Sequence, residues 1–301
     1  MELLRRPPRL KAGSRVALIA PSGPLHDETD LQHALDSARA MGWDPIVGSY
    51  VLERDGYLAG PDEHRLTDLN RFAADTSIDG IWCIRGGYGA MRLLEGVDYD
   101  AWCRHPKTLI GFSDITALHA AIGGRAELVT FHGPTARRRL TDFSRASLKA
   151  AVVDGADPCG HAPDAITLHE GRARGRVVGG NLALLAALCG TPYAASLDGA
   201  ILVLEDVNEA VYRIDRMLTQ LRLSGALPSV AGIAFGRFTD IPEDTTHEAR
   251  PLLDLLGEVA RQCGVPFLAN IPLGHIADQW TIPLGAVAEL DADARTLTVE
   301  T

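Results

Sequence analysis

Short apolar, β-branched runs alternate with amphipathic stretches along the chain, and few folds accommodate this alternation. In the first half of the chain the runs typical of strands are residues 15–20, 44–48, 79–84, 108–112 and 128–131. The helical patterns between them are residues 30–41, 62–74, 89–94 and 114–122. Apolar strands separated by helices are typical of a parallel sheet covered on both faces. The pattern therefore predicts a three-layer α/β domain of the flavodoxin or Rossmann type.

A second domain is predicted after a segment rich in Gly and Pro. A helical run at 143–153 is followed by 154–163, the richest Gly and Pro patch in the chain, so we expect a domain at 1–153, a linker at 154–173 and a domain at 174–301. The later strand candidates are 174–178, 200–204, 230–234 and 266–269, and the helices are 181–188, 211–223 and 247–262. The tail, 280–300, alternates in short segments as antiparallel strands do. The second domain is therefore predicted to be mixed α/β.

Composition excludes several classes of function and location. The 301 residues carry 29 Lys plus Arg against 39 Asp plus Glu, so nucleic acid or an anionic membrane is not an expected partner. The apolar run at 16–20 is too short for a secretory signal, and no run reaches the roughly 18 apolar residues of a membrane span. The five cysteines are scattered without a C-x-x-C pair. We expect a reduced, cytoplasmic protein.

Three predicted strand ends carry residues suited to chemistry, because ligands of open α/β sheets bind outside the carboxyl ends of strands. In GFSDIT, 111–116, Ser113 occupies the turn between a strand and a helix, where the amide of Asp114 would point at the same spot. This resembles a nucleophile elbow, although Ile115 replaces the second glycine of G-x-S-x-G. The alternative is a serine that only caps the helix.

The second strand end is the glycine-rich segment IRGGYGA, 84–90. It fails as a dinucleotide loop because Arg92 stands where the third glycine belongs. Glycines also allow backbone amides to approach a reacting oxygen closely. The segment is either an oxyanion and substrate-binding loop or only a tight turn.

The third strand end, LVLEDVNE at 202–209, places acids after an apolar strand. Glu205 could orient a catalytic imidazole, whereas Asp206 and Glu209 could equally begin the next helix. Of ten histidines, His275 in a Pro and Gly loop is the best base candidate, with His132 as its competitor. Ser113, Glu205 and His275 thus form a candidate triad.

No local pattern of metal ligands is present, and neither a metal nor another cofactor is expected. Cys83 is the tempting alternative nucleophile, but it lies inside a predicted strand with no turn around it. We expect it to be buried and inert.

Seven segments together resemble the motif series of the LD-carboxypeptidase family of serine peptidases. They are RGGYG at 85–89, GFSDIT at 111–116, TFHGP at 130–134, GGN at 179–181, LEDV at 204–207, YRIDRM at 212–217 and LGH at 273–275. They occur in the family's order over residues 10–282. This resemblance implies a two-domain, metal-free cytoplasmic enzyme, expected to be a homodimer, that acts on small peptides recycled from the cell wall.

Carried over to this chain, the resemblance makes Ser113 the nucleophile, His275 the base and Glu205 the residue that orients it. The oxyanion donors would be the backbone amide of Asp114 and that of either Gly86 or Gly87. Arg85 is the candidate for binding the terminal carboxylate of the substrate. The expected reaction releases terminal D-Ala from a muramyl tetrapeptide through an acyl-enzyme.

Two rival interpretations remain at this point. A branch of the same family resembles microcin C immunity peptidases, which cut an amide between a peptidyl aspartate and a modified nucleotide with the same triad. The modest length of the chain and its short 136–175 segment favour the cell-wall enzyme. A non-catalytic α/β ligand-binding protein is the other rival, and the presence of all three triad residues argues against it.

Overall fold

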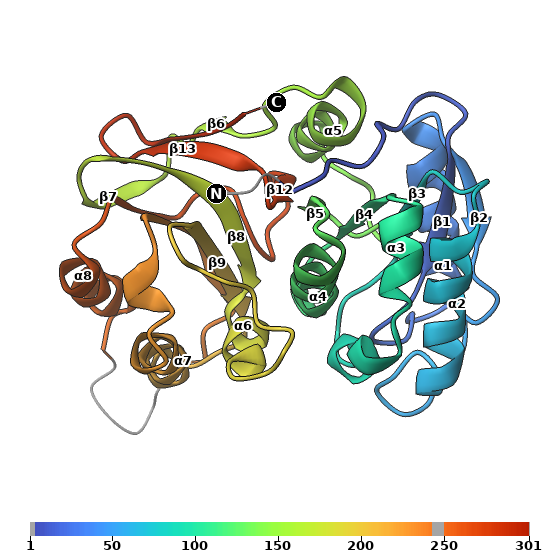
Figure 1. The fold of residues 1–301 in the computed structure, drawn as a ribbon, viewed down its shortest axis with the longest axis horizontal. Coiled ribbons are helices and arrows are strands. Elements are labelled where there is room, and N and C mark those ends of the chain that lie inside the picture. Colours follow the sequence, from blue (N-terminus) through green and yellow to red (C-terminus); the bar gives the residue numbers. More distant parts are fainter. Residues whose placement is uncertain (1–3, 243–249, 301) are drawn as a thin grey trace.

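The computed structural model describes residues 4–242 and 250–300, and these form two sheets with helices packed on them (Figure 1). The first sheet has the order β12-β5-β4-β3-β1-β2. Its first five strands along the chain are parallel to one another: β1 (Arg15–Ile19), β2 (Asp44–Val47), β3 (Gly80–Cys83), β4 (Thr108–Gly111) and β5 (Thr130–His132).

Helices cover both faces of this sheet, which confirms the predicted three-layer α/β architecture. The helices are α1 (Glu28–Ala40), α2 (Asp62–Ala74), α3 (Tyr99–Arg104), α4 (Thr116–Ala126) and α5 (Asp142–Lys149). Alternate residues of β1 enter different cores, because side chains of a strand point to opposite faces. Ala17 and Ile19 pack with residues of α2, α3 and α4, whereas Val16 and Leu18 pack with residues of α1 and α5.

The second sheet is mixed, as predicted, with the order β6-β14-β13-β8-β9-β10-β11-β7. Its parallel centre is β8 (Arg172–Asn181), β9 (Ile201–Val207), β10 (Gly232–Thr239) and β11 (Phe267–Ala269). Antiparallel strands flank it: β6 (Gly160–His161), β7 (Ile166–His169), β13 (Val287–Asp291) and β14 (Thr296–Val299). The helices α6 (Leu182–Leu188), α7 (Val211–Leu223) and α8 (Leu252–Cys263) pack their apolar residues against β9, β10 and β11 in one hydrophobic core.

The differences from the sequence pattern lie in short elements. The 154–173 segment, predicted as linker, contains β6, which has only two residues, and β7, whose four residues are exposed or half-buried and form no continuous apolar run. The sequence pattern also predicts no helix at α3. For the helix predicted at 247–262, residues 247–249 lie outside the described residues, and α8 covers the remainder from Leu252.

One strand ties the two halves of the chain together. The tail contributes β12 (Ile282–Leu284), which pairs antiparallel with β5 at the edge of the first sheet. In Figure 1 this strand lies between the two sheets, beside β5. The loop that precedes β12 and carries His275 is therefore held close to the first sheet.

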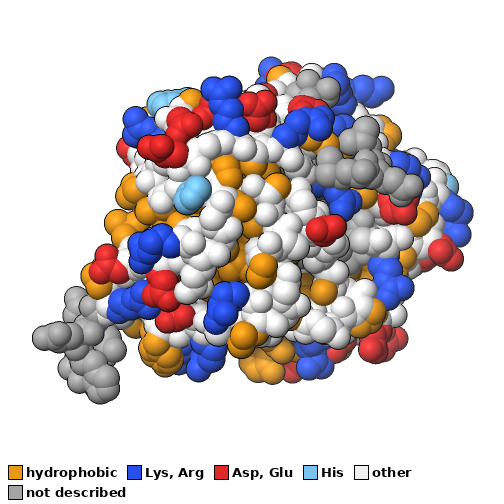
Figure 2. All heavy atoms as spheres, turned by 60° about the vertical axis from the view of Figure 1, so that its left-hand side comes forward, with side chains coloured by type: hydrophobic (Ala, Val, Ile, Leu, Met, Phe, Trp, Pro, Cys, Tyr) orange, Lys and Arg blue, Asp and Glu red, His pale blue; other side chains and the backbone are white. Residues whose placement is uncertain are grey.

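Charged side chains of both signs are present on the surface. Figure 2 shows one face on which Lys and Arg side chains are interspersed with Asp and Glu. Within residues 4–242 and 250–300, no helix combines the length and apolar character needed to cross a membrane.

Candidate active site

Ser113 lies in a strained turn at the carboxyl end of β4. Its φ is +64°, in the left-handed region that residues other than glycine rarely adopt. A short 3₁₀ turn, Ser113–Ile115, then leads into α4. A Cβ at Gly111 would lie 3.0 Å from the side chain of Ile115 and 3.2 Å from Cβ of Cys83, so the glycine makes room for the buried isoleucine. The turn therefore has the geometry of a nucleophile elbow, with Ile115 packed where the usual motif has its second glycine.

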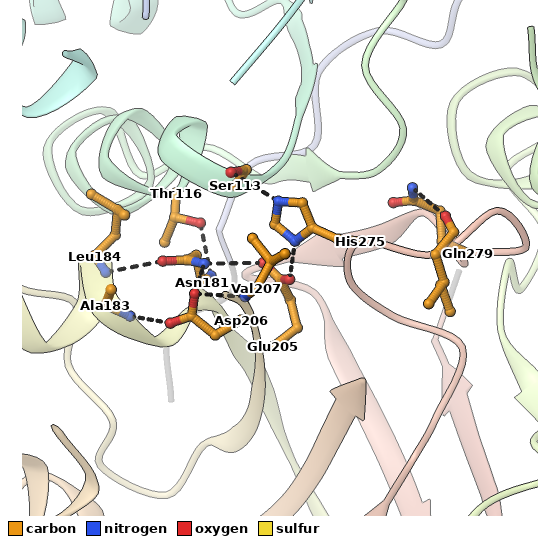
Figure 3. A network of polar contacts seen from close by, with 11 residues as sticks. Ser113, Thr116, Asn181, Ala183, Leu184, Glu205, Asp206, Val207, His275 and Gln279 are labelled. Carbon is orange, nitrogen blue, oxygen red and sulfur yellow. Dashed lines mark hydrogen bonds and ion pairs between the residues drawn. The ribbon is translucent and has the colours of Figure 1, made fainter. Parts of the chain in front are cut away.

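The structure brings Ser113, His275 and Glu205 into one hydrogen-bonded chain (Figure 3). Nδ1 of His275 lies 2.7 Å from Oε2 of Glu205, and Nε2 lies 3.1 Å from Oγ of Ser113. A carboxylate oxygen accepts, so Nδ1 carries the proton and Nε2 is free to accept from the serine hydroxyl. Such an arrangement can remove a proton from the hydroxyl as it attacks a carbonyl carbon.

Local backbone geometry allows this close approach. Glu205 is near the end of β9 and fully buried. Gly274 has a φ of +114°, and a Cβ there would lie 2.9 Å from Cβ of Glu205. The glycine before His275 therefore lets the histidine loop lie directly against the buried acid.

The competing candidates lie away from this chain of hydrogen bonds. His132 is fully buried, burial holds its pKa well below the ordinary value, and His275 rather than His132 contacts Ser113. Cys83 is also fully buried, and burial raises the pKa of its thiol. A neutral, buried thiol is a poor nucleophile.

The glycine loop after β3 packs directly against the elbow. A Cβ at Gly86 would lie 2.9 Å from Cβ of Ser113 and 3.1 Å from its Oγ. Gly87, with a φ of +115°, instead faces Gly23, whose Cα would lie 3.0 Å from an added Cβ. Gly86 is therefore the position where any side chain would collide with the serine.

The carboxylate of Asp114 joins this loop to the elbow. The side chain is buried, which raises its pKa, and its Oδ2 accepts a hydrogen bond of 2.7 Å from the backbone N–H of Ala90. The guanidinium of Arg85 points elsewhere and donates to the carbonyl of Pro24. Of the predicted loop residues, Gly86 therefore packs against the serine and Gly87 packs against Gly23, while Arg85 supports a neighbouring turn.

Two polar residues beside the acid were not predicted as part of the site. Nδ2 of Asn181 donates to Oδ1 of Asp206 at 2.8 Å and lies 3.5 Å from Oε1 of Glu205. Asp206 also accepts from the backbone of Ala183 in the first turn of α6 (Figure 3), and burial raises its pKa to about 6. The GGN segment at 179–181 was the sequence signal for Asn181, but the sequence alone does not show that Asn181 lies beside Glu205.

The histidine loop is fastened to α5 by two buried serines, which the sequence pattern also did not identify. Oγ of Ser144 donates to the carbonyl of Ala277 and accepts from the backbone N–H of Gln279, both at 2.9 Å. Oγ of Ser147 accepts from the backbone of Thr281 at 2.8 Å. These contacts hold the loop of His275 against the first sheet's layer of helices.

Among the residues that the structure describes, no group of three or more His, Cys, Asp or Glu side chains is arranged to hold a metal ion. A serine, an imidazole and a carboxylate at the end of a parallel sheet are the parts from which acyl-transfer hydrolases are built.

Comparison with known proteins identifies the family. The model of the LD-carboxypeptidase N-terminal domain matches residues 16–133, and that of the LD-carboxypeptidase C-terminal domain matches residues 174–290. The chain belongs to the LD-carboxypeptidase family, which places it among the carboxypeptidases, a class of peptide hydrolases.

Named relatives and solved structures agree with this assignment. A Streptomyces coelicolor protein whose name assigns it only to the carboxypeptidases is 44% identical, covering 100% of this chain and 97% of its own. The murein tetrapeptide carboxypeptidase of Pseudomonas aeruginosa is 36% identical, covering 93% of this chain and 94% of its own. The crystal structure of muramoyltetrapeptide carboxypeptidase from Oxalobacter formigenes has a TM-score of 0.85 at 27% identity, over 95% of this chain and 98% of that one.

Proposed function

We propose that this protein is a serine LD-carboxypeptidase that releases terminal D-Ala from murein tetrapeptides during the recycling of cell-wall peptides. The observation that carries the proposal is the continuous hydrogen-bonded chain of Ser113, His275 and Glu205. The 36% identity to a murein tetrapeptide carboxypeptidase supports the choice of substrate.

In the first half of the proposed reaction, Oγ of Ser113 attacks the carbonyl carbon of the L-configured centre that is joined to D-Ala. Nε2 of His275 takes the hydroxyl proton, and the carboxylate of Glu205 stabilises the resulting imidazolium. The tetrahedral intermediate collapses when the C–N bond breaks and His275 passes its proton to the nitrogen of the leaving D-Ala. Ser113 is then acylated by the remaining tripeptide.

In the second half, water replaces D-Ala. His275 removes a proton from the water, the hydroxide attacks the acyl carbon, and the proton returns to Oγ of Ser113 as the ester bond breaks. The backbone amides of Asp114 and of Gly86 or Gly87 are the proposed donors to the oxyanion of both intermediates. The position of Gly86 against Ser113 supports the glycine loop in this role.

The terminal carboxylate of the substrate calls for a cation or a helix N-terminus as its partner. We keep Arg85 as the candidate, because it immediately precedes Gly86 in the loop beside Ser113. Its hydrogen bond to Pro24 would have to be shared or exchanged when substrate binds.

The second candidate function is a microcin C-type immunity peptidase that cleaves a peptidyl-nucleotide amide. It is favoured by the similarity to the Escherichia coli microcin C7 self-immunity protein MccF, which is 25% identical over 96% of this chain and 94% of its own. The structure of MccF in complex with glutamyl sulfamoyl guanosine has the same fold, with a TM-score of 0.89 at 22% identity, covering 100% of this chain and 99% of that one. The same triad would serve both reactions.

The test is release of D-Ala from purified muropeptide tetrapeptide, followed by mass spectrometry, with wild type, Ser113→Ala and a metal chelator in parallel. We expect release by wild type that survives the chelator and is lost in Ser113→Ala. If folded wild type releases no D-Ala, the cell-wall substrate is wrong, and hydrolysis of a peptidyl-nucleotide amide becomes the next assay.

Three further properties stay proposals. We propose a division into domains at 1–153 and 174–301 joined by 154–173, supported by the two separate sheets, although β12 returns to the first. We also propose a cytoplasmic location, supported by five cysteines that are all free thiols. A homodimer is expected from the family resemblance, and sedimentation or light scattering would test it.

A further inference from the structure

We infer that Thr116 is a positioning residue whose hydroxyl sets the separation between the segment that carries Ser113 and the segment that carries Glu205. This inference rests on the proposed role of the triad. The two segments belong to different sheets, so their spacing depends on contacts between the two halves of the chain.

The contact itself is a single buried hydrogen bond. Thr116 is the first residue of α4, three residues after Ser113, and is fully buried. Its Oγ1 accepts a hydrogen bond of 2.9 Å from the backbone N–H of Asn181, the last residue of β8 (Figure 3). A buried backbone N–H needs an acceptor, so removing the hydroxyl would leave this donor unpaired.

The close approach of the two segments depends on the glycine before Asn181. Gly180 has a φ of +133°, and a Cβ there would lie 2.5 Å from Oγ1 and 2.8 Å from Cγ2 of Thr116. No larger residue fits between β8 and the start of α4. The threonine side chain therefore meets the backbone of β8 directly and fixes how near the two elements lie.

The position of Asn181 is passed on to Glu205 through the sheet. The two residues are partners in the parallel pairing of β8 with β9. The side chain of Asn181 is held at both ends, because Nδ2 donates to Asp206 at 2.8 Å and Oδ1 accepts from the backbone of Leu184 at 3.2 Å. A shift of Asn181 therefore moves the strand end that carries Glu205.

These contacts and the catalytic hydrogen bonds together form a closed ring. It runs from Ser113 along the elbow to Thr116, across to Asn181, along the sheet to Glu205, and through His275 back to Ser113. Displacing a reacting group by about 1 Å can cost about a hundredfold in rate. Loosening the Thr116 contact should therefore lengthen the distance from Ser113 to His275 without touching the substrate.

The decisive variant is Thr116→Val, which keeps the β-branched shape and removes the acceptor. We expect kcat for D-Ala release to fall about tenfold to a hundredfold with KM changed by less than about threefold. Thr116→Ser keeps the hydroxyl and should restore kcat to within about threefold of wild type. Both rates are expressed per active site.

The matched control is Thr130→Val. Thr130 is also fully buried, and its Oγ1 has no hydrogen-bond partner within residues 4–242 and 250–300. The same change at this position should leave kcat unaltered. The thermal midpoint of each variant, measured alongside, separates loss of fold from loss of alignment.

A second readout keeps the inference apart from the proposed substrate. The rate at which a fluorophosphonate labels Ser113 reports its activation by His275 and needs no peptide. We expect slow labelling of Thr116→Val and normal labelling of Thr116→Ser and Thr130→Val. Equal kcat and labelling in Thr116→Val and wild type, or equal losses in Thr116→Val and Thr130→Val, would overturn the inference. If wild type is labelled but releases no D-Ala, the proposed function fails, and the labelling comparison still decides the role of Thr116.

Discussion

Replacing Glu205 by Gln isolates the contribution of one buried negative charge. Glu205 is 0% exposed, and its Oε2 lies 2.7 Å from Nδ1 of His275. The amide is nearly the same size, but it removes the charge that stabilises the imidazolium. Nδ2 of Asn181, 3.5 Å from Oε1, is a donor that favours turning the new amide oxygen toward itself.

The size of the effect follows from this geometry. With its oxygen toward Asn181, the glutamine presents NH₂ to Nδ1, which must then accept, so the proton moves to Nε2 and the base is lost. The corresponding loss of charge and tautomer in serine peptidases costs about 10⁴ in kcat. We expect a loss of about 10³ to 10⁴, or about 4 to 5.5 kcal/mol of transition-state stabilisation.

The assay is D-Ala release per active site, with Asp291→Asn as the matched control. Asp291 is another buried carboxylate of the second sheet. Its ion-pair partner is Arg172, at 2.8 Å, whereas that of Glu205 is His275. The control should lose stability and keep its kcat. If Glu205→Gln retains kcat within about tenfold of wild type, the orienting role of Glu205 is refuted.

Three further outcomes are expected. Gly86→Ala would bring a Cβ to 2.9 Å from Cβ of Ser113 and displace the nucleophile. Activity assays should show kcat lowered at least about a hundredfold, and calorimetry should show little change in the thermal midpoint. Ser144→Ala removes two hydrogen bonds from the loop of His275, so urea titrations should show the free energy of unfolding lowered by about 1 to 3 kcal/mol. The kcat should also fall. If neither the free energy of unfolding nor kcat changes, Ser144 does not anchor the loop. Burial raises the pKa of Asp206 to about 6, above its unfolded value, so the native state binds this proton more tightly than the unfolded state does. The free energy of unfolding of wild type, relative to that of Asp206→Asn, should therefore fall as pH rises from about 4 to about 6 and then level off. A rise in the relative stability of wild type over this pH range would contradict the reasoning.

The sequence predicted the main elements well where the periodic signal is long. The helices at 62–74 and 211–223 coincide with α2 and α7, and the apolar runs at 15–20 and 108–112 contain β1 and β4. Short elements were missed where they lack a continuous apolar run. β6 has two residues and α3 has six, and β7 has the same four-residue length as the predicted β4 but is a partly exposed edge strand with the sequence ITLH.

The candidate site was likewise predicted only in part. The residue types and their places after strands were enough to nominate Ser113, Glu205 and His275, and the structure joins them by hydrogen bonds. The choice between His275 and His132 needed the structure, because burial of a histidine and its distance from a serine depend on contacts between distant parts of the chain. Thr116, Asn181 and Ser144 carry no motif that distinguishes a buried anchor from a helix cap.

Hydrophobic period and turn residues are local properties, so the α/β class, the order of the longer strands and helices and the residue types at the strand ends are readable from the amino-acid sequence. The return of β12 to the first sheet, the position of Gly86 against Ser113 and the contact of Thr116 with Asn181 are visible only in the folded protein. Those features join residues tens to more than a hundred positions apart, and their distances follow from how two cores pack against each other.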